Sequence, residues 1–342
     1  MKALVLKEYN NFSYTEVPKP EIQQNEVLVR VKACSICGSD VHGMDGSTGR
    51  RIPPVIMGHE ASGVIEMSGC EVKGFAIGDR VTFDSTIYCG KCFYCRKGKV
   101  NLCDNRKVLG VSCGEYRQQG AFAEYIAVPE HILYRLPDEV TFEQAAMIEP
   151  LSVAMHAVGN TAVALNDTAV VVGAGMIGLL IIQLLKLAGC GRIFAIDLDE
   201  GKLERAKKFG AFMGLLPGTN TTQEILNLTH NRGADIAFEA VGITPTLDMA
   251  IASLKKGGLL TLVGNLSPEV KLPLQKVVTR EIGIKGSCAS NGEYDNCLDL
   301  IASGKVDIDS LISAAAPLSE GQAWFDRLYK GEAGLLKVVL IP

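Results

Sequence analysis

A run of four closely spaced cysteines constrains this chain more than any other feature. Cys89, Cys92, Cys95 and Cys103 follow the spacing C-x2-C-x2-C-x7-C. Four thiolates so close together can complete a tetrahedron around one Zn²⁺, and a site closed by four protein ligands leaves no position for water or substrate. We therefore predict a structural zinc lobe at about residues 88–104. Disulfides and an iron–sulfur cluster, which also uses closely spaced cysteines, are the alternatives.

Length and composition bound the class of protein. A chain of 342 residues is longer than one typical domain, and 47% hydrophobic against 21% charged residues is enough for packed cores. The net charge of −4 argues against binding to nucleic acid or to an anionic membrane. The longest apolar stretch, from Met176 to Leu185, is too short to span a bilayer. Eleven cysteines without a signal peptide favour a reducing compartment, so we expect a cytoplasmic protein without nucleic-acid or membrane partners.

The chain changes character near residue 150. Before that point it contains short alternating segments such as Glu26 to Lys32, separated by glycine-rich turns, which predict an all-β region. From Asp167 onward, strands and helices alternate: Thr168 to Val172 is a buried strand, Met176 to Ala188 a helix, and Arg192 to Ile196 a second strand. This alternation predicts parallel strands joined by crossover helices, and therefore an α/β domain.

A glycine-rich turn follows the first strand of the α/β region. Gly173-Ala174-Gly175-Met176-Ile177-Gly178 lies between a buried strand and an apolar helix, the setting in which this motif binds a dinucleotide pyrophosphate at the helix N-terminus. Asp197 ends the next strand, where a carboxylate accepts ribose hydroxyl hydrogen bonds and repels a 2′-phosphate, so we predict NAD rather than NADP. The predicted cofactor-binding residues are Gly173, Gly175, Met176, Ile177, Gly178, Asp197, Lys202, Val263, Gly264 and Ser287.

A second, scattered set of metal-binding residue types lies outside the cysteine lobe. It comprises Cys37, His59 and the carboxylates Glu60 and Glu149. A mixed sulfur, nitrogen and oxygen set suits zinc, and three protein ligands leave one position for chemistry. Each residue also has an ordinary interpretation: a small buried cysteine, a histidine in the core, or a glutamate at a helix N-terminus.

The motifs together resemble a known family. C-G-S-D-x-H from Cys37, G-H-E-x-x-G from Gly58, the cysteine lobe, E-P-L-S-V from Glu149 and G-A-G-x-I-G occur in the order typical of zinc-dependent medium-chain dehydrogenases/reductases of the polyol branch, which includes sorbitol, threonine and galactitol-phosphate dehydrogenases. The resemblance implies a GroES-like β-barrel catalytic domain over residues 1–150. It also implies a Rossmann NAD-binding domain over 151–286, a doubly wound parallel sheet, and a return of 287–342 to the catalytic domain.

The resemblance also assigns roles. One catalytic zinc is held by Cys37, His59 and a carboxylate, either Glu60 or Glu149, and one structural zinc by the lobe. As a Lewis acid, zinc lowers the pKa of a bound hydroxyl, so that the alcohol can pass a hydride to NAD. Ser39 and His42 match the family's proton relay, since a histidine titrates near neutral pH. Asp40 follows a ligand and is expected to order it.

The implied reaction interconverts a secondary alcohol and a ketone on a polyol, a sugar alcohol or a sugar-alcohol phosphate, in a homodimer or homotetramer. L-threonine and butanediol are alternative substrates, and a zinc-free alkene reductase or a catalytically silent structural protein are alternative functions. The Arg-Tyr pair that sorbitol dehydrogenases carry is absent, because Ile284 to Ala289 occupy that segment. Arg50 and Arg51 could meet a phosphate, although an exposed surface pair is the more common arrangement.

Overall fold

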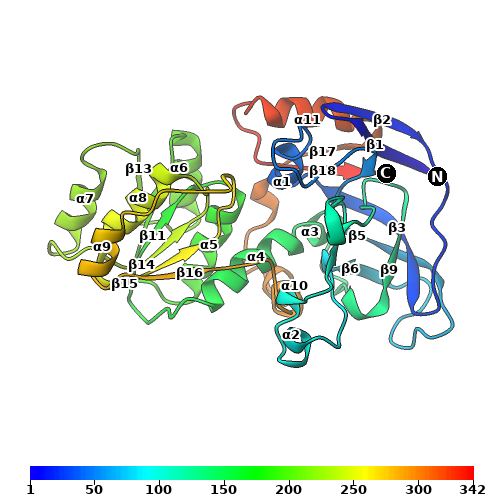
Figure 1. The fold of residues 1–342 in the computed structure, drawn as a ribbon, viewed down its shortest axis with the longest axis horizontal. Coiled ribbons are helices and arrows are strands. Elements are labelled where there is room, and N and C mark those ends of the chain that lie inside the picture. Colours follow the sequence, from blue (N-terminus) through cyan, green and yellow to red (C-terminus); the bar gives the residue numbers. More distant parts are fainter. The chain divides into compact units, whose positions relative to one another are not determined.

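The computed structural model describes residues 1–342, apart from the side chain of residue 115. The chain forms two compact units (Figure 1). The first unit contains residues 1–152 and 290–342, and the second contains residues 153–289. Both chain ends therefore belong to the first unit.

The first unit is built on strands that pair mainly antiparallel. Its largest sheet has seven strands in the order β10-β6-β5-β3-β18-β17, with β9 paired to β3, and a smaller sheet has the order β2-β1-β4. The strands are β1 (Lys2–Glu8), β2 (Asn11–Glu16), β3 (Glu26–Ser35), β4 (Val55–Ile56), β5 (Glu60–Ser68), β6 (Arg80–Phe83), β7 (Thr86–Ile87), β8 (Lys107–Val108), β9 (Tyr125–Pro129), β10 (Leu133–Arg135), β17 (Ile312–Pro317) and β18 (Lys337–Ile341).

The C-terminal strand completes this unit. β18 pairs antiparallel with β3, so that Val339 lies opposite Ser35, and Figure 1 shows the red end of the chain beside the blue one. Ser35 also lies opposite Glu60 across β3 and β5. Three strands far apart in the sequence therefore bring their ends together. The helices of this unit are α1 (Gly38–Val41), α2 (Phe93–Arg96), α3 (Phe142–Ala145), α10 (Tyr294–Ala302) and α11 (Gly321–Tyr329), and α4 (Ile148–Gly159) begins in the first unit and ends in the second.

The second unit is a parallel sheet of six strands in the order β13-β12-β11-β14-β15-β16. The strands are β11 (Thr168–Val172), β12 (Arg192–Ile196), β13 (Met213–Leu215), β14 (Ala234–Glu239), β15 (Leu254–Leu262) and β16 (Gly283–Gly286). The helices are α5 (Met176–Leu187), α6 (Glu200–Lys208), α7 (Thr221–Leu228), α8 (Thr244–Ser253) and α9 (Leu274–Thr279).

The strand order of the second unit defines where a ligand binds. From β11 the chain builds outward through β12 and β13, and then crosses to build the other half from β14 to β16. In such sheets ligands bind at the carboxyl ends of the strands, where the order reverses. The predicted α/β architecture, a GroES-like unit plus a doubly wound parallel sheet, is confirmed. Among the described residues, no helix combines the length and apolar character needed to cross a membrane.

Candidate metal centres and cofactor site

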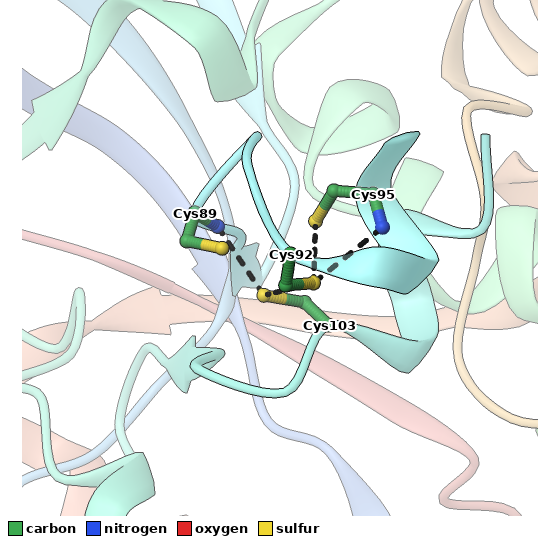
Figure 2. Close-up of side chains that lie close together, drawn as sticks. All are labelled: Cys89, Cys92, Cys95 and Cys103. Atoms are coloured by element: carbon green, nitrogen blue, oxygen red, sulfur yellow. Dashed lines mark hydrogen bonds between the residues drawn. The ribbon is translucent and has the colours of Figure 1, made fainter. Parts of the chain in front are cut away.

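The four lobe cysteines converge on one point. Their sulfur atoms all lie within 4.8 Å of one another, and Figure 2 shows the side chains turned toward a common centre. Cys92 Sγ lies 3.5 Å from Cys95 Sγ and 3.9 Å from Cys103 Sγ. Backbone N–H groups of Cys89 and Asn105 each donate to Cys103 Sγ at 3.3 Å. The lobe therefore presents one four-sulfur set.

The pKa values of these thiols are consistent with the binding of a cation. Hydrogen bonds, first of all from the backbone N–H of Lys91, lower the pKa of Cys89 to about 6. Burial, together with hydrogen bonds to Cys92 and Cys103, raises the pKa of Cys95 to about 12. The thiols therefore do not all ionise together by themselves, because each thiolate opposes the next. A divalent cation removes that conflict, and four sulfurs are a donor set that zinc prefers.

One segment from the far end of the chain anchors the lobe. Val100 N–H donates to Asn291 Oδ1 at 2.8 Å, and Asn291 Nδ2 donates to the Gly98 carbonyl at 2.9 Å. The preceding residue, Ser290, donates to buried Asp84 at 3.1 Å. Residues 290–291, the start of the return to the first unit, thus hold the lobe in place.

A second cluster unites Cys37, His59 and Glu60, whose ligand atoms also lie within 4.8 Å of one another. Cys37 precedes the short helix α1, and Glu60 is the first residue of β5. His59 is 6% exposed and Glu60 is 1% exposed. The fold therefore brings together three of the four residues predicted to serve the catalytic zinc.

Asp40, expected to order a metal ligand, faces His59. Asp40 Oδ2 lies 3.4 Å from His59 Nδ1, and Asp40 is fully buried. Arg51 pairs with the other carboxylate oxygen of Asp40 at 2.8 Å and is 2% exposed. The expectation of an exposed arginine pair is therefore wrong for Arg51, because a buried carboxylate requires a buried partner. Arg50 is exposed as expected.

Glu60 has a partner that sequence reasoning missed. Lys337, the first residue of β18, donates to both Glu60 oxygens at 3.0 and 2.7 Å, and it is 3% exposed. Ser35 also donates to Glu60 Oε2. The only signal in the sequence was a lysine at the start of an otherwise apolar strand.

Glu149 lies near this cluster but is not one of the described residues whose ligand atoms share the 4.8 Å limit. It lies in the first turn of α4, and Ser85 Oγ donates to its Oε1 at 3.3 Å. Burial raises the pKa of Glu149 to about 7, whereas His59 acts in the opposite direction. The carboxyl group is therefore poised between its charged and neutral forms.

The balance of charge favours a divalent cation. Asp40 and Arg51 form one neutral pair, and Glu60 and Lys337 form another. The Cys37 thiol and Glu149 remain. Burial and the neighbouring Glu60 raise the pKa of Cys37, so its thiolate needs a further positive charge. One Zn²⁺ compensates two such anions, and the residues present therefore fit the metal.

The two predicted relay residues lie on or next to α1. Ser39 Oγ donates to Cys37 Sγ at 3.3 Å, and Ser39 is exposed. His42 caps the C-terminal end of α1 and is also exposed. Ser39 therefore lies beside the sulfur of Cys37, and His42 lies at the solvent, one helical turn further on.

The glycine motif of the second unit has the geometry of a phosphate-binding turn. Gly173 has a φ of +95°, and a Cβ on Gly178 would lie 1.8 Å from the Gly173 carbonyl oxygen. Only glycine permits this turn and this close contact. Met176 and Ile177 form the first turn of α5, and Gly175 is its N-cap, so free backbone N–H groups lie at the carboxyl end of β11.

Asp197 follows β12 directly. Its Oδ2 accepts the N–H of Ala174 at 2.7 Å and thereby braces the glycine turn. Its Oδ1 accepts the N–H of Asp199 at 3.0 Å and lies 4.0 Å from Lys202 Nζ. Asp197 and the glycine motif therefore form one hydrogen-bonded site, and Lys202 lies at the edge of that site.

The remaining predicted cofactor residues follow β15 and β16. Val263 and Gly264 donate their N–H groups to the Glu239 carbonyl at 2.9 Å each. Ser287 donates its N–H to Leu262, and its buried hydroxyl has no hydrogen-bond partner among the described residues. Glu239, which was not predicted, is 2% exposed and accepts the N–H groups of Val241 and Gly242. All these groups lie at the carboxyl ends of parallel strands.

Known proteins share this arrangement. The family model of the alcohol dehydrogenase GroES-like domain matches residues 23–138, and that of the zinc-binding dehydrogenases matches residues 177–303. A sorbitol dehydrogenase of Bacillus subtilis is 34% identical, over 100% of this chain and 97% of its own length.

Two solved structures extend the likeness. Galactitol-1-phosphate dehydrogenase from Escherichia coli is 28% identical, with a TM-score of 0.91 over 100% of both chains. A zinc-binding dehydrogenase from Sinorhizobium meliloti, bound to NADP, is 31% identical, with a TM-score of 0.90 over 100% of this chain and 99% of that one. The protein is therefore an oxidoreductase whose cofactors are zinc and a nicotinamide dinucleotide. The chain belongs to the zinc-dependent medium-chain dehydrogenases/reductases, in their polyol dehydrogenase branch.

Proposed function

We propose that this enzyme transfers a hydride between NAD and a secondary alcohol of a polyol, a sugar alcohol or a sugar-alcohol phosphate, and so interconverts alcohol and ketone. The observation that carries the proposal is the buried cluster of Cys37, His59 and Glu60 with Glu149 beside it. Its donor types are those that leave a zinc ion open to substrate. The related sorbitol and galactitol-1-phosphate dehydrogenases support the substrate class.

Cys37, His59 and Glu60 hold the catalytic zinc in this proposal, and Glu149 stands close enough in charge and position to exchange with Glu60. When bound, zinc supplies Lewis-acid chemistry that lowers the pKa of the substrate hydroxyl. Cys89, Cys92, Cys95 and Cys103 hold a second, structural zinc.

The protein's own groups handle the proton. Ser39 Oγ already contacts the Cys37 sulfur, so it is placed to accept the proton of a hydroxyl beside that ligand. His42, exposed at the end of α1, passes the proton to solvent because an imidazole can both accept and donate a proton. Arg51 takes no part in binding a substrate phosphate, since Asp40 already neutralises it.

Asp197 favours NAD over NADP. Its carboxylate lies at the end of β12, where an adenosine ribose binds in this fold, and it repels a 2′-phosphate. Lys202, at 4.0 Å, offsets part of that charge. A direct comparison of kcat/KM for the two cofactors tests this choice, and equal values would contradict it.

We also propose that the enzyme forms a homodimer or homotetramer and is located in the cytoplasm. β16 is an edge strand, and Leu272, Leu274 and Val278 near it are between 44% and 65% exposed. An unpaired edge beside apolar side chains favours pairing with a second copy. All eleven cysteines are free, which suits a reducing compartment.

A substrate panel tests the reaction. Purified protein is mixed with NAD and, in turn, with sorbitol, xylitol, galactitol 1-phosphate, L-threonine and butanediol, and the absorbance of NADH is followed. We expect activity with a polyol, lost on chelation, restored by Zn²⁺ and absent in a His59→Ala variant. Oxidation of L-threonine or butanediol alone would show that the enzyme acts on that alternative substrate and not on a polyol. Activity on alkenes alone, or none at all, would refute the proposal.

A further inference from the structure

Arg51 is a buried charge that the proposed mechanism does not use. It lies between α1 and β4 and is 2% exposed. Its Nε and Nη2 atoms donate to the same oxygen of Asp40, at 3.1 and 2.8 Å. An arginine held by two such bonds is a fixed group, because its planar guanidinium loses its freedom on forming the pair.

The pair controls the direction of a carboxylate that faces a metal ligand. With Oδ1 of Asp40 occupied by Arg51, Oδ2 is left facing His59 Nδ1 at 3.4 Å. Neither Oδ2 nor Nδ1 has another hydrogen-bond partner among the described residues. Because Nδ1 faces Asp40, Nε2 is the atom left to bind a metal. Histidine ligands characteristically donate their second ring N–H to a carboxylate, which fixes the ring.

The same guanidinium touches the proposed proton acceptor. Arg51 Nη2 approaches Ser39 Oγ at 3.4 Å, and Ser39 Oγ in turn donates to Cys37 Sγ at 3.3 Å. The chain makes room for this contact at Gly43, where a Cβ would lie 2.7 Å from Arg51 Cγ. The arginine is therefore seated against the turn that follows α1, at a position that lacks a side chain.

We propose that Arg51 is a positioning residue that orients His59 through Asp40 and orients the Ser39 hydroxyl directly. The rigid guanidinium of Arg51 thereby orients both the histidine ligand and the Ser39 hydroxyl, which accepts the substrate proton. The inference rests on the proposed catalytic metal site and goes beyond it, because it gives a role in the reaction to a residue that contacts neither metal nor substrate.

The test compares Arg51→Met and Arg51→Lys with the exposed neighbour variant Arg50→Met as control. Three quantities are measured: the rate at which a chelator removes the catalytic zinc, the absorption spectrum after Co²⁺ replaces that zinc, and kcat and KM on the active polyol. For Arg51→Met we expect zinc loss about 10–100-fold faster, a shifted cobalt spectrum and a kcat lowered by about the same factor. KM should change little, and Arg50→Met should match the wild type.

Arg51→Lys separates charge from geometry. It restores a cation beside Asp40 but cannot hold Asp40 and Ser39 with one planar group, so we expect near-normal zinc retention with kcat still reduced. A wild-type cobalt spectrum and zinc release in Arg51→Met would overturn the proposal. Should that variant fail to fold, a wild-type spectrum and kcat in Arg51→Lys would overturn it instead. Zinc release and the cobalt spectrum need no substrate, so an inactive wild type would sink the proposed function without deciding this inference.

Discussion

The two candidate metal centres of this protein are built in opposite ways. The lobe takes all four ligands from fifteen consecutive residues, Cys89 to Cys103, and three of the four cysteines remain partly exposed. The other cluster takes its ligands from separate elements, buries His59 and Glu60, and surrounds them with charged groups. The lobe draws its four cysteines from one segment and is anchored by residues 290–291, whereas the second cluster exists only when strands from across the first unit have folded.

This difference in construction predicts a structural role for the lobe and a chemical role for the second cluster. A closed set of identical ligands leaves nothing for a substrate to bind, so its metal binding energy is available only for folding. The second cluster pairs some of its charges and leaves others unbalanced, and Glu149 has a pKa raised to about 7 by burial. Residues that are held between two protonation states are typical of sites that move protons.

Cys95→Ser tests the lobe, and we expect the largest effect there. The variant should lose about one zinc per chain and unfold at a clearly lower temperature, since zinc binding to such sites contributes about 10–16 kcal/mol in isolated peptides. Metal analysis and thermal unfolding measure both changes. Cys70→Ser, at an exposed cysteine outside the lobe, is the matched control. A Cys95→Ser protein that keeps its stability and loses only turnover would show that the lobe serves catalysis rather than structure.

Lys337→Met tests the charge balance of the second cluster. Removing the ammonium leaves Glu60 buried without its partner, which should lower the free energy of unfolding by about 3 kcal/mol or more. Denaturant unfolding of the zinc-loaded protein measures the loss, with exposed Lys305→Met as control. A loss below about 1 kcal/mol would mean that the metal ion, rather than Lys337, compensates Glu60.

Asp84→Asn tests the contact between Asp84 and Ser290, in the segment that anchors the lobe. Asp84 is buried, accepts hydrogen bonds from Thr86 N–H and Ser290 Oγ, and has a pKa raised by burial to about 6. The folded protein therefore holds this proton to a higher pH than the unfolded chain does, and stability falls as pH rises from about 4 to 6.

The variant can still accept the Thr86 N–H at Oδ1 and can donate its amide N–H to Ser290 Oγ, which reverses the second bond, but it cannot ionise. We expect it to match the wild type near pH 4 and to exceed its unfolding free energy by up to about 3 kcal/mol at pH 7. Denaturant unfolding at several pH values measures the difference, which also cancels any shared effect of zinc loss. Asp138→Asn, at an exposed position, should show no such trend, and a pH-independent difference at Asp84 would exclude its titration.

Residue types alone predicted the features contained in one segment, whereas the scattered set of Cys37, His59 and Glu60 also needed the family resemblance, and the residues around that set were missed. The cysteine spacing and the glycine motif at Gly173 are each contained in one segment, so residue types alone were enough to place them. Lys337 could not be assigned, because its contact with Glu60 depends on β18 returning to β3 beside β5. Burial of Arg51 likewise depends on Asp40 and on the space at Gly43, which no single motif shows.

His42→Ala, for which we expect the smallest effect, tests the remaining step of the proposed chemistry. His42 is exposed, so its removal should leave folding and zinc content unchanged. Turnover in alcohol oxidation should fall by about tenfold, which is less than the roughly 10²–10⁴-fold that a general acid or base contributes, because His42 is exposed and solvent can partly replace it. The fall should be greatest at low pH, because hydroxide in solution is then too scarce to take the proton in its place. A steady-state pH profile measures this, and His230→Asn removes another exposed histidine at a backbone angle that asparagine tolerates. Loss of zinc from His42→Ala would instead make His42 part of the metal site and end its assignment as a relay.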